Sequence, residues 1–194
     1  MHTEKQTKHS ILTVSGKKEL LPLVRRSLQN ECIISAEYAN DAASARRCIL
    51  DRYYTIVVIN SPLQGESGVE LAVDTVCQCS ASVLLIVPGA IYAETIERVA
   101  DFGILVIEKP FPVLRLNRAM HFLSAQQTRL QKLEEKVRAA EEKVQEIMLV
   151  DKAKFFLMEH RHMTEAEAHR YIGKQAMDHG MSRKRIAQEI LDDE

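Results

Sequence analysis

The first half of the chain alternates short apolar runs with amphipathic stretches. Five short runs are mainly apolar, which is typical of strands buried on both faces: Ile11–Val14, Ile33–Ile34, Ile56–Ile59, Val83–Val87 and Ile104–Ile107. The stretches between them carry apolar residues at helical spacing: Lys17–Asn30, Ala42–Asp51, Gly68–Cys77 and Ala93–Phe102. Buried strands that alternate with helices belong in a parallel sheet covered on both faces. The pattern therefore predicts a doubly wound α/β domain with a five-stranded parallel sheet over residues 10–115.

Residues 116–148 have a different pattern, with no Pro or Gly and many Lys, Glu, Gln and Arg residues. Apolar side chains recur there at the a and d positions of a heptad repeat, interrupted at d by Ala119, Gln126 and Ala140. The apolar residues predicted to form the dimer seam are Leu116, Leu123, Leu130, Leu133, Val137, Val144 and Ile147. This repeat predicts a coiled-coil dimerisation helix.

Charges beside this seam favour a parallel pair of helices. Arg129 and Lys136 occupy g positions, and Glu134 and Glu141 occupy the e positions five residues further on. In a parallel homodimer each cation can therefore pair with a carboxylate of the other helix. The alternative is a single charged helix that packs on its own α/β domain.

The last segment, residues 149–194, has the boundaries of three short helices at about 148–160, 165–178 and 183–191. Thr164–Glu167 forms a capping-box pattern, Gly180 suits the residue after a helix, and Ser182 can cap the final helix. The apolar faces of these helices are small for an independent core. We expect a small three-helix bundle whose first helix continues the coiled coil.

Composition narrows the classes of function only slightly. The chain has 26 Lys and Arg residues against 27 Asp and Glu residues, so nucleic-acid binding requires a local basic patch. Residues 1–9 are polar and are expected to be disordered; without a signal peptide or a membrane-spanning run, we expect a cytoplasmic protein with no membrane partner. The four cysteines, Cys32, Cys48, Cys77 and Cys79, lack metal-site spacing. No metal or other cofactor is expected.

Three segments at predicted strand ends carry a resemblance to a known family. They are Asn60–Gly68, Val83–Val87 and Glu108–Phe111, the last including a Lys-Pro-Phe sequence. Through them, residues 10–111 resemble a response-regulator receiver domain, which implies a flavodoxin-like fold. The resemblance also implies a phosphorylation site built from an acceptor aspartate, an acidic pair that holds magnesium, a hydroxyl residue and a lysine.

This chain departs from that site at every position except the lysine. Ser15 and Gly16 replace the acidic pair, Asn60 replaces the acceptor and Val87 replaces the hydroxyl residue, while Lys109 remains. Because an amide is a poor nucleophile and the pocket lacks carboxylates for a metal, we expect a receiver that cannot be phosphorylated there. Either Asn60 and nearby backbone groups satisfy Lys109 in one locked conformation, or the surrounding loops bind a regulatory protein or ligand.

The last segment resembles the ANTAR domain, an RNA-binding output module of transcription antitermination regulators. Ala153, Lys154, Leu157 and Met158 match its signature, although Phe155 stands in place of glycine. The resemblance implies a dimer that binds a pair of hairpin loops in nascent RNA. We expect RNA contacts from cations and one aromatic residue: Lys154, Arg170, Tyr171, Lys174, Arg183, Lys184 and Arg185.

Two other functions remain open at this stage. The predicted helices around the turn at Gly180 also mimic a helix-turn-helix, which would make the chain a DNA-binding response regulator. A second alternative is a protein–protein signalling adaptor without a nucleic-acid partner. An enzyme is not expected, because no nucleophile is paired with a base and no Gly-rich phosphate loop follows a strand.

Overall fold

The computed structural model describes residues 8–29 and 31–192. It divides into two compact units, Met1–Gln131 and Lys132–Glu194. Among the described residues, no helix combines the length and the apolar character needed to cross a membrane.

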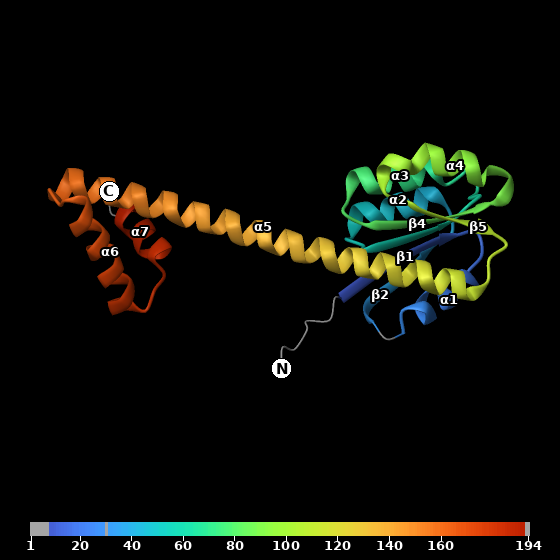
Figure 1. Cartoon of the computed structure of the whole chain (residues 1–194), viewed down its shortest axis with the longest axis horizontal. Helices are drawn as coiled ribbons and strands as arrows, with labels where there is room; N and C mark the ends of the chain where they lie inside the picture. Colours follow the sequence, from blue (N-terminus) through green and yellow to red (C-terminus); the bar gives the residue numbers. More distant parts are fainter. Residues whose placement is uncertain (1–7, 30, 193–194) are drawn as a thin grey trace. The chain divides into compact units, whose positions relative to one another are not determined.

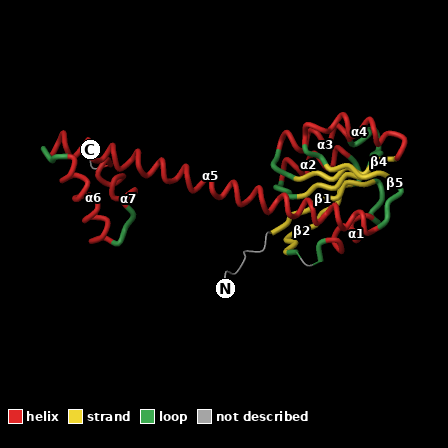
Figure 2. The backbone as a smooth tube through the Cα atoms, viewed as in Figure 1, coloured by secondary structure: helices red, strands yellow, loops and turns green. Residues whose placement is uncertain are grey.

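The first unit is built on a five-stranded sheet in which every pairing is parallel. Figure 2 shows this sheet as the central layer of the unit. The spatial order is β2-β1-β3-β4-β5. The strands are β1 (Lys8–Ser15), β2 (Cys32–Ala39), β3 (Ile56–Asn60), β4 (Ser82–Pro88) and β5 (Leu105–Lys109). The predicted doubly wound α/β fold is confirmed.

Helices cover both faces of this sheet and create two cores (Figure 1). One face is covered by α2 (Ala42–Asp51), α3 (Val69–Gln78) and α4 (Tyr92–Val99), with the short turns η1 (Gly89–Ile91) and η2 (Ala100–Phe102). The other face is covered by α1 (Leu20–Ser27) and by the first turns of α5 (Val113–Arg161). The fifth covering helix and the predicted coiled-coil helix are therefore one continuous helix.

Two residues of the predicted dimer seam belong instead to the receiver core. Leu116 and Leu123 are fully buried, together with Met120, against Ile11 and Ile86 of the sheet. A helix that packs on a sheet needs apolar residues at the same spacing as a coiled coil, and the short helix α1 leaves part of this face uncovered. The assignment of Leu116 and Leu123 to dimerisation was therefore wrong. Leu130 is the first residue of the predicted seam that is exposed.

The expected disorder of residues 1–9 is also corrected in part, because β1 begins at Lys8. His9 is completely buried, and its ring nitrogens lie 2.9 Å from Ser124 Oγ and 3.4 Å from Thr55 Oγ1. These partners come from distant parts of the sequence, so the pattern around His9 could not show them. Residues 1–7 lie outside the described residues.

The second unit joins the end of α5 to α6 (Glu165–His179) and α7 (Arg183–Asp192). Its core is small and is formed by the following buried side chains: Ala153, Leu157, Ala168, Ile172, Ala176, Ile186, Ala187 and Ile190. The capping box of Thr164 and Glu167 is present, and Gly180 has a positive φ of 61° after α6. Ser182 accepts a hydrogen bond from the Arg185 backbone at 3.3 Å, as expected of a helix cap.

Candidate nucleic-acid interface

An open groove of about 460 Å³ runs along one side of the small bundle. Its walls come from the end of α5, the turn that follows and the exposed side of α6. The lining residues are Arg161, His162, Met163, Glu167, Arg170, Tyr171 and Lys174. We call this surface the α5–α6 groove. It brings together three of the residues that the sequence assigned to RNA contact, Arg170, Tyr171 and Lys174.

Arg161 and Tyr171 contact each other in the α5–α6 groove. The Arg161 guanidinium donates a hydrogen bond to the Tyr171 hydroxyl at 3.0 Å, and its central carbon lies 5.5 Å from the ring centroid. Tyr171 is half-buried and packs against the bundle core, so its ring is held in place. A fixed aromatic ring beside a cation is suited to a base or a phosphate of a nucleic acid.

Sequence reasoning missed Arg161. It ends α5, ten positions before Tyr171, and nothing in that spacing shows that the two helices bring the side chains together. The only local signal was a cation directly after the predicted end of a helix, where a positive charge usually interacts favourably with the helix dipole. The contact between the two helices places Arg161 in the α5–α6 groove.

The charge of the α5–α6 groove is positive. Arg161, Arg170 and Lys174 contribute three cations, and Glu167 contributes the one carboxylate among the lining residues. Glu167 is engaged in the capping box, where hydrogen bonds from the backbone and hydroxyl of Thr164 lower its pKa. Glu167 therefore stays ionised, and the three cations and one carboxylate leave the lining with a net charge of +2, which attracts an anion.

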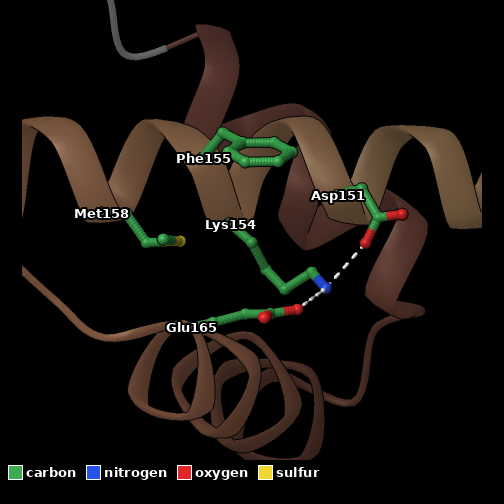
Figure 3. Close-up of a pocket in the computed structure, with 5 residues that line it drawn as sticks. All are labelled: Asp151, Lys154, Phe155, Met158 and Glu165. Atoms are coloured by element: carbon green, nitrogen blue, oxygen red, sulfur yellow. Dashed lines mark hydrogen bonds and ion pairs between the residues drawn. The ribbon is translucent and has the colours of Figure 1, made fainter.

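Lys154, another predicted RNA contact, lies in a different cavity. Its ammonium pairs with Asp151 at 2.7 Å and with Glu165 at 3.0 Å (Figure 3). Hydrogen bonds to these two carboxylates raise its pKa, the larger effect coming from Asp151. An ammonium held by two carboxylates has little positive potential to offer a phosphate.

The three basic residues at the start of α7 do not form one patch. Lys184 donates to Gln145 at 3.4 Å, and Arg185 pairs with Glu189 at 3.5 Å. Arg183 is exposed, and its guanidinium lies alongside Gly173, 3.9 Å from where a Cβ would stand. Because Gly173 has no side chain, the Arg183 guanidinium of α7 can lie beside this part of α6.

In the receiver, the residues at the positions of the phosphorylation site bond to one another and to the backbone. The Asn60 amide donates to Ser15 Oγ at 2.9 Å, and the Lys109 ammonium donates to the backbone carbonyl of Ser61. Ser15 and Val87 are buried, and burial lowers the pKa of Lys109. Asn60 thus bonds Ser15 and not Lys109, whereas a backbone group does satisfy the lysine. Within the described part of the chain, no three His, Cys, Asp or Glu residues gather as a metal site.

Comparisons with known proteins agree with this architecture. Residues 138–191 match the family described as the ANTAR domain. Over 138 residues the chain is 25% identical to the transcriptional regulatory protein PdtaR of Mycobacterium tuberculosis, with 71% of this chain and 67% of that protein covered.

Solved structures match the receiver fold. The signal receiver domain of an HD domain-containing protein from Pseudomonas fluorescens has a TM-score of 0.56 at 20% identity, covering 68% of this chain and 98% of that one. A response regulator receiver domain from Clostridium thermocellum gives 0.54 at 13% identity, with 63% and 98% covered. A chain titled adenylate cyclase from Rhodopirellula baltica gives 0.59 at 16% identity, with 68% and 98% covered. At these identities the likeness shows the fold alone.

The parallel sheet, its covering helices and these likenesses show that the first unit has the fold of a receiver domain. The matched C-terminal segment makes the assignment more specific. Together with the similarity to PdtaR, the ANTAR domain over residues 138–191 supports an ANTAR response regulator.

Proposed function

We propose that this protein is an RNA-binding transcription antitermination regulator that acts in the cytoplasm as a homodimer on hairpin loops of nascent RNA, without catalytic activity of its own. The observation that carries the proposal is the α5–α6 groove, which is lined by three cations and by a tyrosine that one of them contacts, all within the ANTAR segment. Loop bases in RNA are unstacked, so a protein can bind them by stacking on aromatic rings and by pairing cations with phosphates.

Dimerisation is supported by the part of the seam that the receiver core leaves open. Leu130, Leu133, Val137, Val144 and Ile147 are each between 41% and 57% exposed. Apolar side chains at heptad spacing gain stability when a second helix covers them. A parallel homodimer would present two identical grooves, one for each loop of a hairpin pair.

The proposed input is non-covalent. The Ser15–Asn60 bond and the absence of acidic residues at positions 15, 16 and 60 argue against an acyl phosphate. A regulatory protein or ligand that contacts the surrounding loops would then replace phosphorylation as the signal.

The test is a binding comparison at matched salt between hairpin RNA and duplex DNA of the same sequences. We expect the full chain to retain hairpin RNA. Arg170→Glu with Lys174→Glu should remove this binding, because phosphate contacts become repulsive. Arg138→Glu on the exposed side of α5 is the matched control and should bind nearly as wild type does.

Other outcomes would favour the alternatives. Preference for duplex DNA would favour a helix-turn-helix function of α6 and α7. If the wild-type chain retained neither nucleic acid but still dimerised, a protein adaptor would become the better description.

A further inference from the structure

The ANTAR segment contains a second cavity, of about 170 Å³, that shares no lining residue with the α5–α6 groove. Its walls are Asp151, Lys154, Phe155 and Met158 of α5 and Glu165 at the start of α6 (Figure 3). We call it the Phe155 cavity.

Phe155 is exposed to an extent that the fold does not explain. Its side chain is 68% exposed, whereas the adjacent Phe156 packs against the bundle core and stacks on His160. The ANTAR signature has glycine at the position of Phe155, so this chain adds an aromatic ring where the family pattern has no side chain. An exposed ring at the edge of a cavity is available to stack on a planar ligand.

The polar side of the cavity favours a ligand with hydrogen-bond donors over an anion. Two carboxylates face one ammonium, which gives the lining a net charge of −1. Lys154 uses two of its three donor positions on Asp151 Oδ1 and Glu165 Oε1. The third hydrogen of the ammonium and the second oxygen of each carboxylate can therefore serve a ligand.

We propose that the Phe155 cavity binds one unstacked RNA base that carries an exocyclic amine, with cytosine as the best fit. This inference rests on the proposed RNA-binding function. The base stacks on Phe155, its amine donates to Asp151 or Glu165, and Lys154 donates to a ring nitrogen or carbonyl of the same edge. Carboxylates are the usual acceptors for the cytosine amine. A cavity of about 150 Å³ is known to hold benzene, so this one suits a single six-membered ring.

Uracil has the size to enter the same cavity but lacks the amine that donates to a carboxylate. It presents a carbonyl oxygen where cytosine presents the amine, and that oxygen would face a carboxylate. The Phe155 cavity should therefore discriminate between the two pyrimidines.

The experiment uses the full chain and a pool of hairpin RNAs with randomised loops, with the bound fraction sequenced. Wild type should enrich cytosine at one loop position. Phe155→Leu and Phe155→Gly should lose that enrichment and bind the selected hairpin roughly 5- to 100-fold more weakly, the range for removing one base-stacking contact. Met177→Ala, which alters a side chain 83% exposed on α6, is the matched control and should behave as wild type.

A second variant tests the hydrogen bonds. Asp151→Asn with Glu165→Gln places amides that can donate to a carbonyl, so it should accept uracil and cytosine about equally at the selected position. Circular dichroism establishes that each variant is folded.

The outcomes separate this inference from the function on which it rests. If wild type enriches no hairpin, the proposed function is wrong. If wild type enriches hairpins but the Phe155 variants keep the same preference and affinity, the cavity is not a base site. Enrichment of uracil by wild type, or unchanged discrimination in the double amide variant, would likewise overturn the inference.

Discussion

At the scale of single residues, a hydrogen bond joins the uncharged side chains of Asn60 and Ser15. The resemblance to receiver domains implies carboxylates at these positions. The Asn60 amide donates to Ser15 Oγ at 2.9 Å, and Gly16 adds no side chain. A carboxylate at position 60 alone would still lack the acidic pair that positions magnesium.

We therefore predict that Asn60→Asp does not restore phosphorylation. Incubation with acetyl phosphate and magnesium, followed by intact-mass measurement, should show no added phosphoryl group. The comparison variant adds Ser15→Asp and Gly16→Asp, and a Cβ at Gly16 would meet no atom within 4 Å. Labelling of Asn60→Asp alone would show that the acidic pair is dispensable.

Thr164 provides a second prediction at this scale. Its hydroxyl accepts a hydrogen bond from the Glu167 backbone at 3.3 Å and begins α6. Thr164→Ala should lower the free energy of unfolding of the C-terminal unit by about 0.5–2 kcal/mol, because the cap is lost. Thr164→Ser keeps a capping hydroxyl and should therefore keep most of the stability of the wild type. Thermal unfolding followed by circular dichroism measures the difference. Equal stability of the two variants would contradict the assigned role of the cap.

At the scale of elements, β1 and α5 meet at a buried histidine. His9 lies 2.9 Å from Ser124 Oγ of α5 and 3.8 Å from the Glu31 carboxylate. Burial lowers the pKa of His9, and Glu31 partly opposes that shift. The folded state therefore binds a proton less readily than the unfolded chain, in which the histidine pKa is about 6.5.

This linkage predicts that the receiver loses stability as the pH falls below about 6.5, because protonation favours the unfolded state. Urea unfolding at pH 7 and at pH 5 should show the loss, and His9→Gln should reduce the difference. His121→Gln is the control, since His121 also faces Glu31 but is 55% exposed. A pH dependence unaltered by His9→Gln would assign the effect to other groups.

The success of sequence reasoning also differs between elements. The buried strands β3 and β4 were predicted correctly, because a short, continuous apolar run between turns is typical of a strand buried on both faces. The predicted second strand stopped at Ile34, but β2 continues to Ala39, because this edge strand includes Ser35 and Glu37. Leu116 was misassigned because packing on a sheet and packing on a second helix require the same apolar spacing.

Site residues were harder to predict than elements. Arg170, Tyr171 and Lys174 share a helix, so their proximity followed from spacing. Arg161 and the carboxylate partners of Lys154 come together through contacts between helices, which a single sequence does not show.

At the scale of the whole molecule, the proposed dimer would depend on the seam that begins at Leu130. Val137→Asp with Val144→Asp should convert the proposed dimer to a monomer, because two carboxylates would be placed at facing a positions. Light scattering across a concentration series measures the change. Ala139→Asp, on an exposed position outside the seam, should remain dimeric. A wild-type chain that stays monomeric at every concentration would refute the seam.

The Ser15–Asn60 bond has a consequence for timing. In a phosphorylated receiver, hydrolysis of the acyl phosphate limits the lifetime of the activated state. A receiver without an acyl phosphate has no such built-in limit. The lifetime of its activated state is set by the dissociation rate of the molecule that binds it. On this proposal, transcription would track the momentary concentration of the regulator's effector and would retain no record of earlier stimuli.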